Sequence, residues 1–413
     1  MSKPLPRQPE INIGTLGHVD NGKSTLVQAI SGVWTGRHSE ELKRGITIRI
    51  GYADAAIYRC PMCEEPFNYM THDICPVHGV ETEFVRAVSF VDCPGHHSLM
   101  ITMLSGAALF DGAVFVLDAR QRFPQPQDSE HLQAAAILGI RNIVFVQNKI
   151  DLVDRRRALE NYEEVVRYVK SLGYEDPVVV PVSSQHGIGV EPLLYAMERY
   201  IPTPERGVAQ PYRMPIIRSF DVNTPGKPAR EIAGAVIGGS IIQGILKRGD
   251  EIEIAPGVAK PGQQKPGYEP LFTEAVSIMA GGRRVEDASP GGLTGVETTL
   301  DPSLGKSDGL VGNMAGKPGT LPPTWTRLRI EYILFQRVLG VQDEIIVKPI
   351  MEKEPLVINV YSAVTSGIVT RKTSEYIELE LTRPVCAEIG RRVTLSRKIG
   401  AGWRLIGYGT IVS

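Results

Sequence analysis

Residues 17–24 carry the first side chains with evident chemistry. They read Gly-His-Val-Asp-Asn-Gly-Lys-Ser and match the G-x-x-x-x-G-K-[ST] pattern of a phosphate-binding loop. Lys23 is expected to reach the β- and γ-phosphates of a nucleotide, and the Ser24 hydroxyl to ligate Mg²⁺. We assign nucleotide contacts to Asp20, Asn21, Gly22, Lys23, Ser24 and Thr25, and Mg²⁺ contacts to Ser24 and Asp20. The alternative is a chance match in a glycine-rich turn.

A second motif, Asn148-Lys149-Ile150-Asp151, indicates which base is bound. The Asp151 carboxylate can accept hydrogen bonds from guanine N1–H and from its exocyclic amine, and adenine offers neither donor there. The stem of Lys149 can lie over the flat base. Ser183 and Ser184 end a later strand, where their backbone can meet the base oxygen. Together with the phosphate loop, these residues predict a guanine nucleotide rather than an adenine one.

Asp92-Cys93-Pro94-Gly95-His96 follows a β-rich run and predicts the part of the site that faces the γ-phosphate. Asp92 is expected to hold Mg²⁺ through water, and Gly95 allows the backbone to approach the phosphate. His96 can orient the attacking water, although a surface histidine without such a role is the alternative. Thr47, in Arg44-Gly45-Ile46-Thr47, can complete the Mg²⁺ shell when the γ-phosphate is present, which makes its segment a candidate switch.

The chain has five cysteines, of which Cys60, Cys63 and Cys75 fall close together. With His78 they form a C-x₂-C…C-x₂-H pattern, which suits a tetrahedral Zn²⁺ ion in a structural site. His72 is a less well-spaced competitor for the fourth position, and an unmetallated loop is the alternative. A knuckle over residues 58–80 has little apolar content, so a metal is expected to hold its fold.

The elements that must position these motifs alternate along the first half of the chain. Residues 11–16 predict a buried strand before the phosphate loop, and residues 24–30 a helix that Gly32 ends. Continuous apolar runs at 88–91, 113–117, 142–146 and 178–182 predict parallel strands covered on both faces. Helical periodicity appears at 127–138, 155–172 and 190–200. This order predicts a doubly wound α/β domain over residues 1–204.

Short β-rich runs separated by Gly and Pro follow residue 204 and predict small closed barrels. A second break at 317–323 divides them, so we expect one barrel at 205–323 and another at 324–413. Residues 256–270 are expected to form a long surface loop. Positive charges cluster near the C-terminus at Arg391, Arg392, Arg397, Lys398 and Arg404, beside Trp403 and Tyr408. They suit RNA phosphates, or simply form a solvated barrel face.

Composition excludes several classes of protein. The net charge is −1, so any nucleic-acid site must be a local patch rather than a global field. No apolar run approaches 18 residues, and the N-terminus lacks a signal-peptide core. We therefore expect a soluble, cytoplasmic protein with no membrane partner.

These motifs together resemble the translational GTPases, and most closely the gamma subunits of archaeal and eukaryotic translation initiation factor 2. The closer match rests on further stretches, which extend over nearly the whole chain: residues 32–35, 38–47, 103–108, 218–226, 237–241 and 403–409. Two positions depart from the family pattern. Asn21 stands where these GTPases usually carry His, and His78 where the knuckle usually ends in Cys.

The resemblance implies a GTPase domain with an inserted zinc knuckle, two β-barrels, and slow hydrolysis of GTP to GDP with Mg²⁺. It implies delivery of initiator methionyl-tRNA to the small ribosomal subunit, together with alpha and beta partner subunits. The absence of a eukaryote-length N-terminal extension favours an archaeal protein. The competing interpretations are a selenocysteine-type elongation factor, a metabolic GTPase similar to the sulfate-activation enzyme, and a scaffold that binds GTP without turnover.

Overall fold

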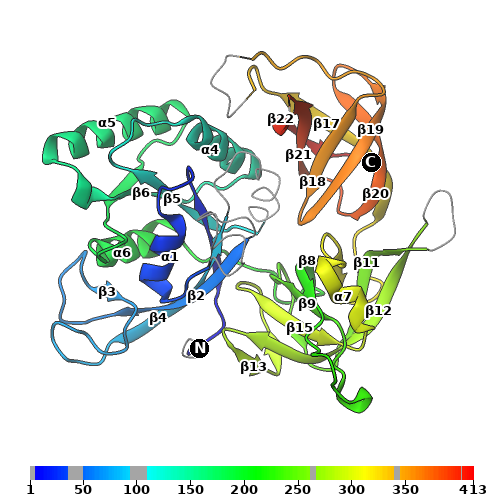
Figure 1. Cartoon of the computed structure of the whole chain (residues 1–413), viewed down its shortest axis with the longest axis horizontal. Helices are drawn as coiled ribbons and strands as arrows, with labels where there is room; N and C mark the ends of the chain where they lie inside the picture. Colours follow the sequence, from blue (N-terminus) through cyan, green and yellow to red (C-terminus); the bar gives the residue numbers. More distant parts are fainter. Residues whose placement is uncertain (1–4, 36–49, 94–108, 261–266, 339–344, 401) are drawn as a thin grey trace. The chain divides into compact units, whose positions relative to one another are not determined.

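The computed structural model describes residues 5–35, 50–93, 109–260, 267–338, 345–400 and 402–413. The chain forms two compact units, Met1–Pro204 and a second made of Glu205–Val338 and Ile345–Ser413 (Figure 1). None of the helices in the described ranges is long and apolar enough to cross a membrane.

A seven-stranded sheet forms the centre of the first unit, in the order β3-β2-β4-β1-β5-β6-β7. The strands are β1 (Ile11–Leu16), β2 (Gly51–Arg59), β3 (Tyr69–Met70), β4 (Glu83–Asp92), β5 (Gly112–Asp118), β6 (Ile143–Asn148) and β7 (Val178–Pro181). Five neighbouring strands of this sheet, β4, β1, β5, β6 and β7, pair in parallel. Strand β2 pairs antiparallel with both β3 and β4. The predicted doubly wound α/β domain is confirmed.

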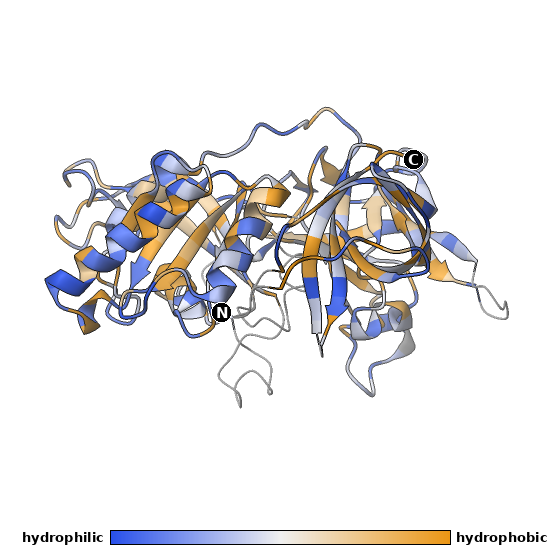
Figure 2. Cartoon of the chain, turned by 90° about the horizontal axis from the view of Figure 1, so that it is seen from above, coloured by the Kyte–Doolittle hydropathy of each residue, from blue (hydrophilic) through white to orange (hydrophobic). Residues whose placement is uncertain are grey.

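Helices α1 (Lys23–Ser31), α4 (Pro126–Leu138), α5 (Arg155–Ser171) and α6 (Val190–Tyr200) follow strands β1, β5, β6 and β7. Leu26 of α1 and Leu193 of α6 share a core with Val114 and Val116 of β5. All seven residues of β5 are buried although successive side chains point to opposite faces, so both faces of the sheet are covered. In Figure 2 the strands of this central sheet are largely hydrophobic, and the helices beside them carry hydrophilic residues.

Two closed six-stranded barrels form the second unit, as predicted. The first contains β8 (Arg213–Phe220), β9 (Val236–Gly239), β11 (Glu251–Ala259), β12 (Tyr268–Ala280), β15 (Thr294–Thr298) and β16 (Met314–Gly316), and pairing between β11 and β12 closes it. The short elements β10 (Leu246–Lys247), β13 (Arg283–Val285), β14 (Asp287–Ala288) and α7 (Pro302–Gly305) decorate it. The second contains β17 (Thr324–Leu334), β18 (Pro355–Val360), β19 (Ala363–Lys372), β20 (Tyr376–Cys386), β21 (Arg392–Ile399) and β22 (Gly402–Ile411).

The prediction of a surface loop over residues 256–270 is wrong at both ends of that range, where the residues belong to strands. The hairpin of β11 and β12 continues past Pro256, with Val258 opposite Glu269 and Ala259 opposite Tyr268. A register shift between Ile254 and Val258 accommodates the Pro-Gly pair, although these two residue types usually end a strand. The antiparallel strand β2 was also missed, since residues 51–59 contain few β-branched side chains.

Candidate functional site

The phosphate loop connects β1 to α1 and has the backbone that its glycines were expected to provide. Gly17 has φ +124°, and a Cβ there would lie 2.1 Å from the carbonyl oxygen of Val116. Gly22 has φ +94°, and its Cβ would lie 2.4 Å from the side-chain nitrogen of Asn148. Both positions therefore require glycine, for conformation and for space. The loop carries its backbone N–H groups to the start of a helix, which is an anion-binding arrangement.

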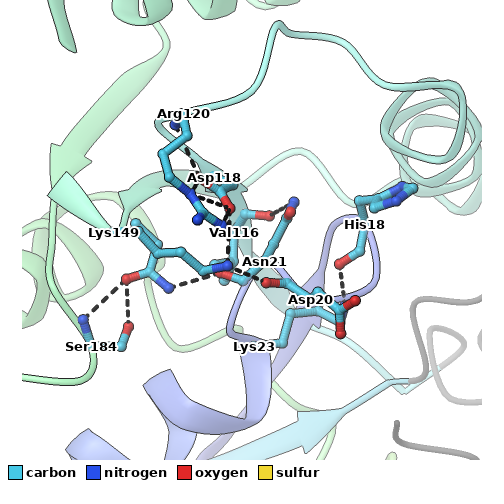
Figure 3. A network of polar contacts seen from close by, with 10 residues as sticks. His18, Asp20, Asn21, Lys23, Val116, Asp118, Arg120, Lys149 and Ser184 are labelled. Atoms are coloured by element: carbon cyan, nitrogen blue, oxygen red, sulfur yellow. Dashed lines mark hydrogen bonds and ion pairs between the residues drawn. The ribbon is translucent and has the colours of Figure 1, made fainter. Parts of the chain in front are cut away.

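Lys23 begins α1, and its side chain folds back over the loop. Its Nζ donates to the carbonyl oxygens of Gly17 at 3.0 Å and His18 at 2.7 Å, so the ammonium is held inside the loop (Figure 3). Burial lowers the pKa of Lys23, although Asp92 and Asp128 oppose that effect. An ammonium group has three donors, so one remains for a phosphate oxygen.

Asp92 ends β4 and collects three hydroxyl groups. Its carboxylate accepts hydrogen bonds from Thr15 at 2.7 Å, from Ser24 at 2.6 Å and from Thr35 at 2.5 Å. The structure thus brings together Ser24 and Asp92, both predicted for Mg²⁺, with oxygen atoms of the kind that this ion prefers. Thr35 was not assigned a role, and the only signal for it was its place in a stretch that carries the family resemblance. The predicted Thr47, Gly95 and His96 lie outside the described residues.

Asn148 ties the base motif to the phosphate loop. Its amide nitrogen donates to the carbonyl oxygen of Asn21 at 2.7 Å, and its oxygen accepts from the N–H of Ser184 at 3.0 Å and from the Ser184 hydroxyl at 2.9 Å. The side chain of Asn21 donates in turn to the carbonyl oxygen of Val116 at 2.9 Å (Figure 3). The unusual Asn21 is therefore part of the framework that fixes the loop to β5.

Asp151 lies in the short 3-10 helix Ile150–Leu152 and is exposed. Ser183 is the main cause that lowers the pKa of Asp151, and Nε2 of His186 lies 3.7 Å from the Asp151 carboxylate. An ionised, exposed carboxylate at the carboxyl edge of a parallel sheet suits recognition of two N–H donors on a base.

Two residues of α4 accept hydrogen bonds from the phosphate loop, and the sequence did not predict either of them. The N–H of His18 donates to Asp128 at 3.0 Å, and the N–H of Gly17 donates to Nδ1 of His131 at 3.1 Å. Burial raises the pKa of Asp128 to about 6 and lowers that of His131 to about 3. No sequence pattern marked them, because their partners are 110 and 114 residues away.

The knuckle between β2 and β4 assembles the four predicted metal ligands. The Sγ atoms of Cys60, Cys63 and Cys75 lie 3.7, 3.4 and 3.6 Å from Nδ1 of His78. Ligand atoms around a tetrahedral Zn²⁺ lie about 3.3–3.8 Å apart, so the side chains fit this ion. The cluster found among the described residues includes His78 and not His72.

The cationic cluster of the second barrel is partly engaged within the barrel itself. The guanidinium of Arg391 lies 3.6 Å from the ring centroid of Tyr361, and Arg397 forms an ion pair with Glu354. Elsewhere, burial raises the pKa of the Cys93 thiol, which is typical of a small core residue rather than a nucleophile.

Comparisons with known proteins agree with this site. A family model described as "Elongation factor Tu GTP binding domain" matches residues 8–203, and one described as "Initiation factor eIF2 gamma, C terminal" matches residues 326–411. Among solved structures, a bacterial selenocysteine-specific elongation factor has a TM-score of 0.71 at 21% identity; the match covers 97% of this chain and 58% of that protein. The elongation factor SelB of Methanococcus maripaludis, in complex with a GTP analogue, has a TM-score of 0.71 at 20% identity, over 99% of this chain and 80% of its own. At such identities these two structures bear on the fold alone.

Sequence relatives are much closer. The protein named "Translation initiation factor 2 subunit gamma" from Pyrococcus furiosus is 54% identical, over 98% of each chain. The protein of the same name from Archaeoglobus fulgidus is 53% identical, over 98% of this chain and 94% of its own. That from Methanocaldococcus jannaschii is 50% identical, over 99% of each chain. The chain is a translational GTPase, and it belongs to the family of translation initiation factor 2 gamma subunits.

Proposed function

We propose that this chain, as the GTP-binding gamma subunit of a heterotrimer with alpha and beta subunits, carries initiator methionyl-tRNA to the small ribosomal subunit. The carrier state contains GTP, and GTP is hydrolysed when the start site is selected. The observation that supports this most is identity of half or more over nearly the full length of relatives with this name. That identity extends over both barrels as well as the nucleotide site, and we place the protein in the cytoplasm.

Base recognition rests on Asp151 and Lys149 at the end of β6. The carboxylate accepts the guanine N–H groups, and the lysine stem packs on the ring. Asn148 belongs to the same site, and its hydrogen bonds to Asn21 and Ser184 hold the two loops together. Phosphate recognition rests on the N–H groups of residues 20–25 and on the remaining donor of Lys23. These residues bind GDP and GTP alike.

Mg²⁺ fits the cluster around Asp92, which gathers two of the predicted ligands among oxygen atoms. We propose that Ser24, Asp92, Asp20 and Thr47 hold it. When bound, the ion would supply positive charge that stabilises the nucleotide phosphates. His96 orients the attacking water, and the N–H of Gly95 faces the γ-phosphate.

Zn²⁺ fits the knuckle over residues 58–80, and we propose that Cys60, Cys63, Cys75 and His78 hold it as a structural ion. Four protein ligands leave no open position for catalysis. The apolar support is small: Cys60, Met70 and Cys75 are its buried members. The metal therefore supplies much of the free energy that folds this segment.

Three domains follow from the same proposal: a GTPase domain at 1–204 and barrels at 205–323 and 324–413. The γ-phosphate distinguishes GTP from GDP through Thr47 and Gly95, so these residues carry the switch. A coupling of about 1–3 kcal/mol, or about 5- to 150-fold in tRNA affinity, is typical of such switches.

The test is a tRNA protection assay on the assembled trimer with GDP and with a non-hydrolysable GTP analogue. Charged initiator tRNA should bind more tightly with the analogue, while elongator and selenocysteyl-tRNA should bind weakly. Thr47→Ala should remove much of the difference and keep GDP affinity. Equal affinity in both nucleotide states would leave a constitutive tRNA binder, and preference for selenocysteyl-tRNA would make the chain an elongation factor.

A further inference from the structure

We propose that Asp118, supported by Arg120, is a positioning residue for the guanine nucleotide: it holds the Lys149 ammonium so that the lysine stem is fixed as the platform for the base. The inference rests on the proposed base site, in which Lys149 packs on guanine. Neither Asp118 nor Arg120 belongs to a sequence motif of that site.

The sheet register places Asp118 beside the base motif. Asp118 is the last residue of β5 and pairs in parallel with Asn148, the last residue of β6. Lys149 therefore follows directly at the same sheet edge, where it adopts the left-handed backbone conformation with φ +61°. That conformation is uncommon for a residue with a side chain, and it directs the chain into the following turn.

The Lys149 ammonium has two attachments. It forms an ion pair with Oδ2 of Asp118 at 2.9 Å and donates to the backbone carbonyl oxygen of Asp20 at 2.5 Å (Figure 3). One attachment is on β5 and the other is on the phosphate loop. The lysine thus connects the loop that holds the phosphates with the strand beside the base, and its stem cannot swing away while both contacts persist.

The carboxylate of Asp118 is itself fixed. Its side chain is fully buried, and it accepts from the Arg120 N–H at 3.0 Å and from the guanidinium Nη2 at 2.7 Å. Burial alone would raise the pKa of Asp118, but hydrogen bonds from Arg120 and Lys149 outweigh it and lower the pKa to about 2. The group is therefore a permanent anion at neutral pH, and it has one well-defined position.

A nucleotide can use this arrangement in either phosphorylation state. Guanine is common to GTP and GDP, so loss of the Asp118 contact should weaken both to the same degree. The hydrolysis step depends on groups around the γ-phosphate, so the rate at saturating nucleotide should stay unchanged. A purely structural defect would instead lower both the fraction of protein that binds nucleotide and the stability of the folded chain.

The experiment is a double-mutant cycle on the full chain, with a fluorescent GDP and a non-hydrolysable fluorescent GTP analogue as probes. The variants are Asp118→Ala, Lys149→Ala and the double variant. Asp118→Ala should raise the Kd of both probes roughly 10- to 100-fold, the range for losing a hydrogen bond to a charged group. In the Lys149→Ala background it should cause little further loss, because the two residues act through one contact.

Three further variants serve as controls. Asp118→Asn keeps an acceptor oxygen without the charge and should give an intermediate loss. Arg120→Ala removes only the guanidinium contact and should cause a smaller loss than Asp118→Ala, since the Arg120 backbone N–H and Lys149 still hold the carboxylate. Asp111→Asn removes a carboxylate just before the start of β5, where it accepts the N–H of Asn12 at 2.8 Å, and should leave both Kd values unchanged.

The outcomes separate the inference from the proposed site. Lys149→Ala binding both probes normally would mean that the base site itself is misassigned. If Lys149→Ala weakened binding as expected but Asp118→Ala had no effect, the positioning role of Asp118 would be wrong and the base site would stand. Full additivity in the double variant would overturn it too, because Asp118 would then act independently of the lysine. Unequal losses for the GDP and GTP probes would place Asp118 at the phosphates instead.

Discussion

Replacing Asp128 by Asn should remove a pH dependence of folding that the native chain has between about pH 4 and pH 6. Asp128 is buried in the first turn of α4, where its two oxygens accept the N–H groups of His18 and Gln125, each at 3.0 Å. Burial raises the pKa of this carboxyl group from 3.8 to about 6, although both hydrogen bonds and Lys23 oppose the rise.

The sign follows from proton binding. A carboxyl whose pKa is higher in the folded chain binds its proton more tightly there, so folding is favoured while the proton is present. The stabilisation is complete below about pH 4 and is lost as the pH rises through about 6. A difference of two pH units corresponds to about 3 kcal/mol. An asparagine side chain cannot titrate. As the pH rises from about 4 to about 6, the native chain should therefore lose about 3 kcal/mol of unfolding free energy that Asp128→Asn keeps.

Urea unfolding at a series of pH values measures this difference. Trp34 lies in the first unit, and Trp325 and Trp403 lie in the second. In a background with Phe at the last two positions, Trp34 fluorescence reports the first unit alone.

Asp118→Asn is the control, because the pKa of Asp118 is lowered to about 2 in the folded chain. Its difference from the native chain should be constant above about pH 5. A constant difference for Asp128→Asn as well would refute the reasoning, since the carboxylate would then titrate as if exposed.

Three other predictions concern the base, the metal and the loop. Asp151→Asn should weaken GTP binding and improve xanthosine triphosphate binding, because an amide can donate to the extra xanthine oxygen; unchanged GTP preference in a competition assay would contradict the guanine assignment. Elemental analysis should find one Zn²⁺ per chain, most of it lost in His78→Ala and kept in His72→Ala; the reverse would reassign the fourth ligand. Gly17→Ala should abolish nucleotide binding, because its Cβ would lie 2.1 Å from a backbone oxygen. Gly32 has φ +71° and open space around it, so Gly32→Ala should cost about 1–2 kcal/mol of stability and keep binding, as calorimetry can test.

Local patterns in the sequence determined the motifs and most of the elements. Gly17 to Ser24 specifies its own loop, since the required backbone angles depend on which residues are glycine. The continuous apolar run in β5 requires cover on both faces, which predicts a parallel sheet with helices around it. The short β-rich runs after residue 204 predict barrels for a similar reason. In each case the physical cause acts over a few neighbouring residues, so reading along the chain is enough.

Tertiary structure decided which distant side chains support those motifs. Asp128 and His131 reach the phosphate loop from α4, Thr35 reaches Asp92 across 57 residues, and Asp118 meets Lys149 through the register of β5 and β6. The hairpin of β11 and β12 likewise continues through a Pro-Gly pair that locally resembles a loop. Hydrogen bonds and ion pairs act only over a few ångströms. Which groups come that close depends on sheet order, register and helix packing, and these arise from the burial of the whole chain rather than from the spacing of any one motif.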